Sequence, residues 1–275
     1  MHNQILEIAL SPCPNDVFIV SALLLKKIKT FFDLRFYFED IETLNNLAIN
    51  SSFPIIKTSF AIWNLIVSNY ELLPVGSALG FGVGPLLVGI KPYQIEEFKR
   101  LKIVIPGKHT TAHFLFNFFY SGKIEKIFTR YDKIIPYLLE KKAELGILIH
   151  EGRFLYFKYN LYKIADLGKF WEKNTEAPLP LGGFFIKKNL SGEIKNEIIR
   201  LFKKSIAWAE NNWKEVLPLL KNYAQELDEE TIKKHVSTYV NEYTYELKDS
   251  ALKGLTIFKD FLNIKKSLKE LIWGI

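Results

Sequence analysis

Short apolar runs alternate with segments of helical periodicity along much of the 275-residue chain. The first apolar run, at 5–10, is followed by a polar segment, 11–16, and then by apolar residues at helical spacing over 17–29. This order predicts a strand, a loop and a helix. The same order recurs with strands at 34–38, 54–58 and 101–105, followed by helices at 43–49, 60–67 and 112–120. Repeated alternation of this kind predicts an α/β fold.

Several residues mark where further elements begin. Asn15 or Asp16 is the predicted N-cap of the first helix. Helical periodicity dominates from Ser191 onward, and Ser191 and Asp228 are predicted N-caps because acidic residues follow each of them in the first turn. The apolar run at 145–149 predicts one more buried strand.

The segment 72–90 carries no charged residue over a length that could cross a membrane. It contains five glycines and two prolines, which disfavour a helix in lipid. A loop followed by a buried strand at 85–90 is predicted instead, with no membrane contact. The first residues lack a cationic stretch, and Glu7 interrupts their apolar run, so we expect a cytoplasmic protein without a signal peptide.

The formal net charge of +7 comes almost entirely from lysine, because only five of the 37 basic residues are arginine. Arginine is the residue that reads phosphate and guanine in a planar, bidentate way, so this balance argues against a nucleic-acid partner. Cys13 is the only cysteine. An intrachain disulfide and a multi-cysteine zinc site are therefore excluded.

Three polar loops join the end of a predicted strand to the start of a helix, at 11–16, 57–59 and 109–112. The free N–H groups and the positive dipole end of a helix start favour carboxylate or phosphate. Ligands in open α/β sheets bind beyond the carboxyl ends of the strands. The three loops therefore predict a shared cleft for an anionic ligand.

Three other patterns lack the residues that their chemistry requires. The segment 102–110 has neither the first glycine nor the Ser or Thr of a phosphate-binding Walker loop, and 80–85 has the wrong spacing for a dinucleotide fingerprint. His109 and His113 have the spacing of a zinc-binding helix, but Thr110 stands where the catalytic glutamate would follow. Nucleoside triphosphate, NAD and zinc roles are therefore not expected.

His150 directly follows the predicted strand 145–149 and so lies where that strand reaches the cleft. Imidazole is the side chain best matched to proton transfer near neutral pH, which makes His150 a candidate catalytic group, with a structural histidine as the alternative. Cys13, between two prolines, is interpreted as a structural residue because no acid–base partner for it is identifiable from the sequence.

Seven segments follow one another in a characteristic order: 11–16 (SPCPND), 39–45 (EDIETLN), 78–86 (ALGFGVGPL), 106–112 (PGKHTTA), 150–154 (HEGRF), 179–183 (LPLGG) and 235–241 (HVSTYVN). Together they resemble the 1,4-dihydroxy-6-naphthoate synthase family of the futalosine route to menaquinone. The segments extend over nearly the whole chain, so the resemblance concerns the entire sequence.

The resemblance implies a two-domain α/β fold of the periplasmic-binding-protein-like type II, with two interdomain crossovers. Residues 1–90 and 182–275 would form a larger discontinuous domain, and residues 91–181 a smaller inserted domain. The first boundary agrees with the strand at 85–90, which the sequence pattern places at the exit from the first domain.

The resemblance also implies an activity. Members of this family convert cyclic dehypoxanthine futalosine, an anionic aromatic carboxylate, to 1,4-dihydroxy-6-naphthoate with release of dihydroxyacetone, a carbon–carbon lyase reaction in menaquinone biosynthesis for which no metal or organic cofactor is expected. His150 matches the family's proton acceptor. The residues that match the substrate-binding stretches are Lys57, Thr58 and Ser59 in one domain and Thr111 and Ala112 in the other.

Two alternatives stay open. A chorismate dehydratase-like sibling enzyme has a similar fold, although the segments around His150 and His109 favour the synthase. A non-catalytic solute-binding protein for small anions would also share the fold, but the expected lack of a signal peptide or lipid anchor counts against it. The sequence leaves open a homodimer and assistance to His150 from Glu151, Arg153 or Asn15.

Overall fold

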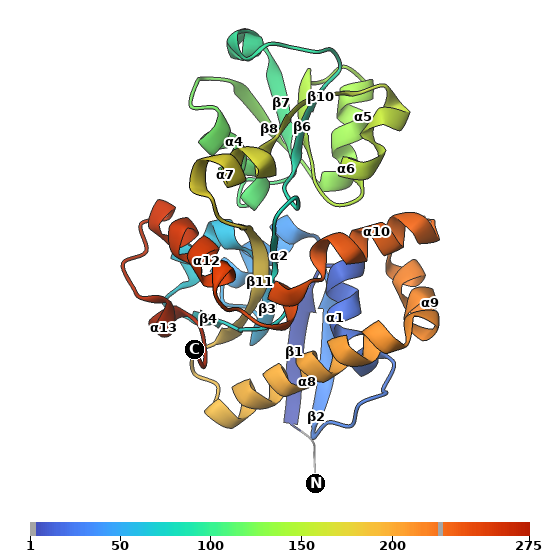
Figure 1. Ribbon diagram of the computed structural model, residues 1–275, viewed down its shortest axis with the longest axis vertical. Coiled ribbons are helices and arrows are strands. Elements are labelled where there is room, and N and C mark those ends of the chain that lie inside the picture. Colours follow the sequence, from blue (N-terminus) through green and yellow to red (C-terminus); the bar gives the residue numbers. More distant parts are fainter. Residues whose placement is uncertain (1–3, 225–227) are drawn as a thin grey trace.

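Two β-sheets, each with its own helices, form two lobes in the computed structural model, which describes residues 4–224 and 228–275 (Figure 1). The first lobe holds a sheet of order β2-β1-β3-β11-β4, in which β5 also pairs with β11. The second lobe holds a sheet of order β10-β6-β9-β7-β8. The predicted α/β fold is confirmed.

The strands of the first lobe are β1 (Gln4–Leu10), β2 (Phe32–Phe38), β3 (Ile55–Ser59), β4 (Tyr70–Leu72), β5 (Ala78–Gly80) and β11 (Leu179–Lys187). Those of the second lobe are β6 (Leu86–Gly89), β7 (Lys102–Ile105), β8 (Glu125–Phe128), β9 (Leu145–Leu148) and β10 (Tyr162–Asp166).

The helices of the first lobe are α1 (Pro14–Leu24), α2 (Ile41–Ile49), α3 (Trp63–Ile66), α8 (Gly192–Asn211), α9 (Trp213–Tyr223), α10 (Glu229–Tyr239), α11 (Glu242–Tyr245), α12 (Ser250–Phe261) and α13 (Leu268–Leu271). Those of the second lobe are α4 (Thr111–Phe119), α5 (Ile134–Leu139), α6 (Gly152–Leu155) and α7 (Leu167–Thr175), and 3₁₀ turns lie at Phe60–Ile62, Ile95–Arg100, Tyr131–Lys133 and Tyr156–Tyr159.

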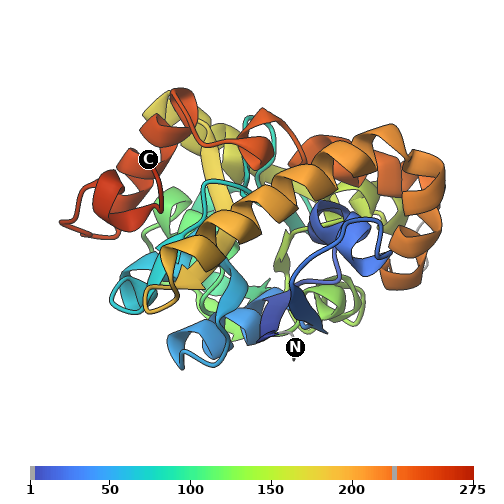
Figure 2. The same cartoon turned by 90° about the horizontal axis from the view of Figure 1, so that it is seen from below.

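The first sheet places the starts of α1 and α2 at one edge. Strand β1 runs parallel to β2 and β3, so the carboxyl ends of all three strands lie together, next to the helices that follow them. Helix α8 crosses the sheet beside α1 (Figure 2) and buries one core with it, in which Ile8, Phe18, Phe184 and Phe202 take part. The core thus fixes the edge at which the loops emerge.

The predicted helix boundaries hold in part. The side chains of Ser191 and Asp228 accept hydrogen bonds from backbone N–H groups in the first turns of α8 and α10, which confirms both as N-caps. Helix α1 ends at Leu24, earlier than the end predicted at residue 29. The segment 72–90 forms short strands and loops, and no helix among the described residues is long and apolar enough to cross a membrane.

The chain passes between the lobes twice, once between β5 and β6 and once between β10 and β11, which confirms the two predicted crossovers. The boundary predicted at residue 90 comes too late, because β6 pairs with β9 and β10 and so belongs to the second sheet. The boundary at 182 likewise falls inside β11, which pairs with β3 of the first sheet. Apolar runs show that a strand forms but not which sheet it joins.

An aromatic cluster joins the lobes away from their sheets. Trp171 of α7 in the second lobe is fully buried and lies 5.5 Å from Phe258 and 5.6 Å from Phe261, both on α12 of the first lobe, between ring centroids. Phe114 of α4 lies 4.6 Å from Phe258. Aromatic pairs at these distances add to the free energy of apolar burial, so the cluster holds the lobes together.

We expect Trp171→Ala to lower the free energy of unfolding by about 3–5 kcal/mol, because it leaves a cavity where the two lobes meet. Urea denaturation followed by circular dichroism measures this loss. Phe31→Ala is the control, since Phe31 is 82% exposed and its loss should leave stability nearly unchanged. Equal stability of the two variants would contradict this account of the cluster.

Candidate functional site

A cavity lies between the lobes and is lined by side chains from both of them. The first lobe lines it with residues from α1, β3, β11 and the end of α10. The second lobe contributes the start of α4 and the end of β9. The predicted site residues Lys57, Ser59, Thr111, Ala112 and His150 all line this cavity.

The start of α1 differs from the prediction in a way that shapes the cavity. Cys13, not Asn15 or Asp16, is the N-cap, and its carbonyl accepts the N–H groups of Asp16 and Val17. Pro14 then occupies the first helical position, where it needs no N–H partner. Asn15 and Asp16 therefore lie inside the first turn, and both line the cavity.

Asp16 and Lys57 form a buried ion pair beneath the cavity. The Lys57 Nζ lies 2.7 Å from Asp16 Oδ1, with both side chains almost fully buried. Lys57 also donates to the Gly76 carbonyl at 2.8 Å, and Ser11 Oγ donates to the other oxygen of Asp16 at 3.0 Å. Two of the three lysine N–H donors are thus used within the protein, and the Lys57 Nζ also lies 4.9 Å from the centroid of the Phe184 ring.

His150 stands at the end of β9 with its imidazole held from several sides. Its backbone has a left-handed φ of 51°, which is uncommon for a residue with a side chain and redirects the chain at the cavity wall. The ring lies 4.8 Å from that of Tyr131 in an edge-on contact and 6.1 Å from the nearly parallel ring of His235. Burial lowers the pKa of His150, although Glu151, Asp16 and Asp40 oppose this shift electrostatically.

Cys13 touches the imidazole of His150 across the gap between the lobes. Its Sγ lies 3.2 Å from Nδ1 and 3.7 Å from Nε2 of that ring. Burial, with the neighbouring Asp16 carboxylate, raises the pKa of the Cys13 thiol, so the sulfur stays protonated and is a poor nucleophile. Cys13 is therefore a structural residue that also contacts the candidate base, His150.

His235 connects the region of His150 to Asp16. Its Nε2 lies 2.9 Å from Asn15 Oδ1, and the Asn15 amide in turn donates to Asp16 at 2.8 Å. Because the amide nitrogen of Asn15 faces a carboxylate, its oxygen must accept, and His235 Nε2 must carry a hydrogen. Burial, followed by the neighbouring His150 and Arg153, lowers the pKa of His235 well below its usual range, so the ring is neutral.

The two predicted binding stretches reach the cavity unequally. In β3, the side chains of Lys57 and Ser59 line the cavity, whereas Thr58 is fully buried and does not line it. Successive side chains along a strand point to opposite faces, so Thr58 lies on the other face of β3. In α4, Thr111 and Ala112 line the cavity, and the Thr111 hydroxyl donates to the Leu181 carbonyl at 2.7 Å.

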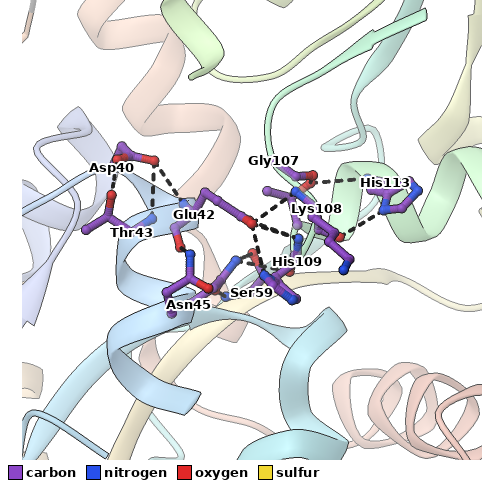
Figure 3. A network of polar contacts seen from close by, with 11 residues as sticks. Asp40, Glu42, Thr43, Asn45, Ser59, Gly107, Lys108, His109 and His113 are labelled. Atoms are coloured by element: carbon purple, nitrogen blue, oxygen red, sulfur yellow. Dashed lines mark hydrogen bonds and ion pairs between the residues drawn. The ribbon is translucent and has the colours of Figure 1, made fainter. Parts of the chain in front are cut away.

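A carboxylate of the protein occupies the loop at 106–109. Glu42, in the first turn of α2, accepts the N–H groups of Lys108 and His109 and lies 3.0 Å from His109 Nδ1 (Figure 3). Gly107 has a φ of 119°, and a Cβ built there would lie 2.5 Å from a Glu42 oxygen, so glycine is required. The backbone N–H groups just before α4 therefore already bind a carboxylate, the side chain of Glu42.

His109 and His113 contact different partners. His113 Nδ1 lies 2.8 Å from the Lys108 carbonyl, while its Nε2 lies 3.2 Å from the Lys126 amine. Over residues 4–224 and 228–275, no three His, Cys, Asp or Glu side chains gather in a way that could hold a metal ion.

Sequence reasoning assigned no role to five residues that shape this site: Glu42, Asn45, Tyr131, His235 and Tyr239. Tyr239 lines the cavity and accepts a long hydrogen bond of 3.5 Å from Arg153. His235 and Tyr239 are four residues apart on α10, and Glu42 and Asn45 are three apart on α2, so each pair shares one helix face. This spacing could have indicated that each pair faces the same site, but residues on ordinary solvent-exposed helix faces have the same spacing.

Residues 6–263 of the chain match a family model described as menaquinone biosynthesis. The chain belongs to this menaquinone biosynthesis family. Two relatives named 1,4-dihydroxy-6-naphthoate synthase support the assignment. The protein from Thermus thermophilus is 38% identical over 244 residues, 89% of each chain, and that from Streptomyces coelicolor is 30% identical over 263 residues, 93% of each chain.

Solved structures confirm the fold of this family member. A crystallised protein from Archaeoglobus fulgidus matches with a TM-score of 0.88 at 32% identity, covering 96% of this chain and 99% of that one. The periplasmic aliphatic sulphonate binding protein of Escherichia coli matches with a TM-score of 0.65 at 10% identity, covering 99% and 92%. The second match shows the periplasmic-binding-protein-like fold alone.

Removing one member of the buried ion pair should destabilise the protein. We expect Lys57→Met to lower the free energy of unfolding by about 3–5 kcal/mol, because it leaves the Asp16 carboxylate uncompensated. Urea unfolding measures the loss. The double variant Lys57→Met with Asp16→Asn should recover most of it, and wild-type stability of Lys57→Met alone would show that the pair carries no such constraint.

Proposed function

We propose that the chain converts cyclic dehypoxanthine futalosine to 1,4-dihydroxy-6-naphthoate with release of dihydroxyacetone. The observation that carries this proposal is the placement of His150, which faces a cavity lined by polar groups of both lobes. Membership of the menaquinone biosynthesis family and the names of the two relatives support the same reaction.

In this proposal His150 is the general base. A base needs a free nitrogen lone pair. In this proposal the hydrogen of the neutral ring lies on Nδ1, next to the Cys13 sulfur, and Nε2 accepts the substrate proton. Proton removal allows the carbon–carbon bond to break, and its electrons remain in the ring that becomes aromatic. The left-handed backbone and the flanking Tyr131 and His235 rings hold the imidazole in one orientation.

The binding stretches hold the anionic aromatic substrate from two sides. Lys57 offers its remaining N–H and Ser59 its hydroxyl, while Thr58 connects them along β3. Thr111 and Ala112 approach from the start of α4, where a helix terminus favours negative charge. A substrate held by both lobes is shielded from water during the reaction.

Purified protein incubated with cyclic dehypoxanthine futalosine should produce the naphthoate and dihydroxyacetone, both detected by mass spectrometry. Chorismate in a parallel incubation tests the dehydratase alternative. Tight binding of the futalosine compound by folded protein without product would favour the solute-binding alternative and overturn the proposed reaction.

We expect His150→Gln to lower kcat by about 10²–10⁴-fold while changing substrate affinity by only a few fold, because it removes the base and keeps a polar side chain. Steady-state kinetics and equilibrium binding measure the two effects separately. Lys158→Gln is the control, since it removes an exposed amine beyond α6. Near-normal turnover by His150→Gln would rule out the assigned base.

The pH profile should show the lowered pKa of His150. A general base acts in its unprotonated form, so kcat/KM should fall as pH decreases through this pKa, and burial places that fall below the ordinary histidine value of about 6.5. The acidic limb should disappear from the residual activity of His150→Gln. An acidic limb above pH 7 would contradict the neutral, buried state of the ring.

A further inference from the structure

Asn45 joins the two substrate-binding stretches through one buried amide. Its Oδ1 accepts the backbone N–H of Ser59 at 2.8 Å, and its Nδ2 donates to Ser59 Oγ at 3.1 Å and to the His109 carbonyl at 3.0 Å (Figure 3). The partners fix which end of the amide is oxygen, because an N–H must meet oxygen and a carbonyl must meet nitrogen. Both amide hydrogens are therefore used.

This contact determines the direction of the Ser59 hydroxyl. Ser59 Oγ already accepts a hydrogen from the Asn45 amide. Among the described residues, the Ser59 hydroxyl has no acceptor for its own hydrogen. The hydroxyl hydrogen is free to point into the cavity that Ser59 lines. Thr111 is the opposite case, because its hydroxyl donates to Leu181 and so presents only lone pairs to a ligand.

Ser59 and Lys57 are two residues apart on β3, so their side chains lie on the same face of the strand. One offers an O–H donor and the other its remaining N–H donor. Two neighbouring donors match the two oxygens of a carboxylate, whereas a carboxamide would bring an NH₂ group against one of them.

We propose that Asn45 is a positioning residue that makes Ser59 a hydrogen-bond donor and so completes, with Lys57, a carboxylate cradle on the first lobe. This inference rests on the proposed function, because it assigns the carboxylate of that substrate to this side of the cavity. The phenolic hydroxyls that appear at the other end of the product then face Thr111, which can accept from them.

The test compares two stable probes of the product skeleton, 2-naphthoate and 2-naphthamide, by calorimetric binding to the full chain. Wild type should bind the carboxylate about tenfold more tightly than the amide, and Ser59→Ala should reduce this preference to about threefold or less. Asn45→Asp should have the same effect, because its carboxylate captures the Ser59 hydrogen.

A double-variant cycle separates this mechanism from simple charge repulsion. If Asn45 acts through Ser59, then Asn45→Asp should change the preference by less than about twofold in a Ser59→Ala background. Asn46→Asp is the matched control, since it makes the same change on the neighbouring, exposed position of α2 and should keep the wild-type preference. Thermal unfolding checks each variant, and Asn45→Ala replaces Asn45→Asp if the buried charge prevents folding.

Independent effects of the Asn45 and Ser59 substitutions would overturn the inference, as would equal binding of the two probes by wild type. Turnover of cyclic dehypoxanthine futalosine by wild type is measured in parallel. Turnover together with equal probe binding would leave the proposed function standing without the cradle. A clear carboxylate preference without turnover would instead remove the proposed reaction and keep Asn45 as the residue that orients Ser59.

Discussion

The buried pair of Asp16 and Lys57 is the constraint on which the site depends. Neither charge could stay beneath the cavity alone, so the first turn of α1 must lie against β3 wherever this chain is folded. The pair also fixes the positions of the residues around it. Ser11 donates to Asp16 and accepts the N–H of Cys13, whose sulfur touches His150. One ion pair thus sets the position of the sulfur that contacts the imidazole.

The second lobe contributes the imidazole and one helix start to the cavity. His150 and the start of α4 belong to it, so the cavity has its imidazole only when the two sheets face one another. The aromatic cluster around Trp171 and the contacts of α2 with the loop at 106–109 hold this arrangement from different places. Apolar packing gives the lobes their attraction, and the polar contacts, which depend on direction, set their register.

The sequence predicted those features that are local in the chain. Strands β1, β7 and β9 and the place of His150 follow from apolar runs and from what comes after them. Strand β11 could not be recognised, because its start is rich in proline and glycine and its pairing partners lie far away in sequence. The cap of α1 was misassigned because Asp16 is a good capping residue that has a stronger partner in Lys57.

The polar side chains of the site were harder to foresee for a related reason. Glu42 and Asn45 occupy helix positions that in most proteins face water, and nothing nearby in the chain shows that a loop more than 60 residues away covers them. His235 likewise reads as a helix residue until Asn15 is placed beside it, 220 positions away. Contacts between segments brought together only by the fold leave no periodic signal in a single sequence.

The net charge of the chain and the charge of its cavity are separate matters. The protein carries +7, yet Lys57 in the cavity wall is balanced by Asp16, and the anion-binding loop at 106–109 is filled by Glu42. An anionic ligand therefore meets oriented hydrogen-bond donors rather than excess positive charge. Donors already held in place by the protein need no reorganisation when the ligand arrives, and they act strongly where water is excluded. Selectivity in such a cavity depends on the direction of each hydroxyl and amide, and in the proposed cradle the neutral side chain of Asn45 sets one of these directions.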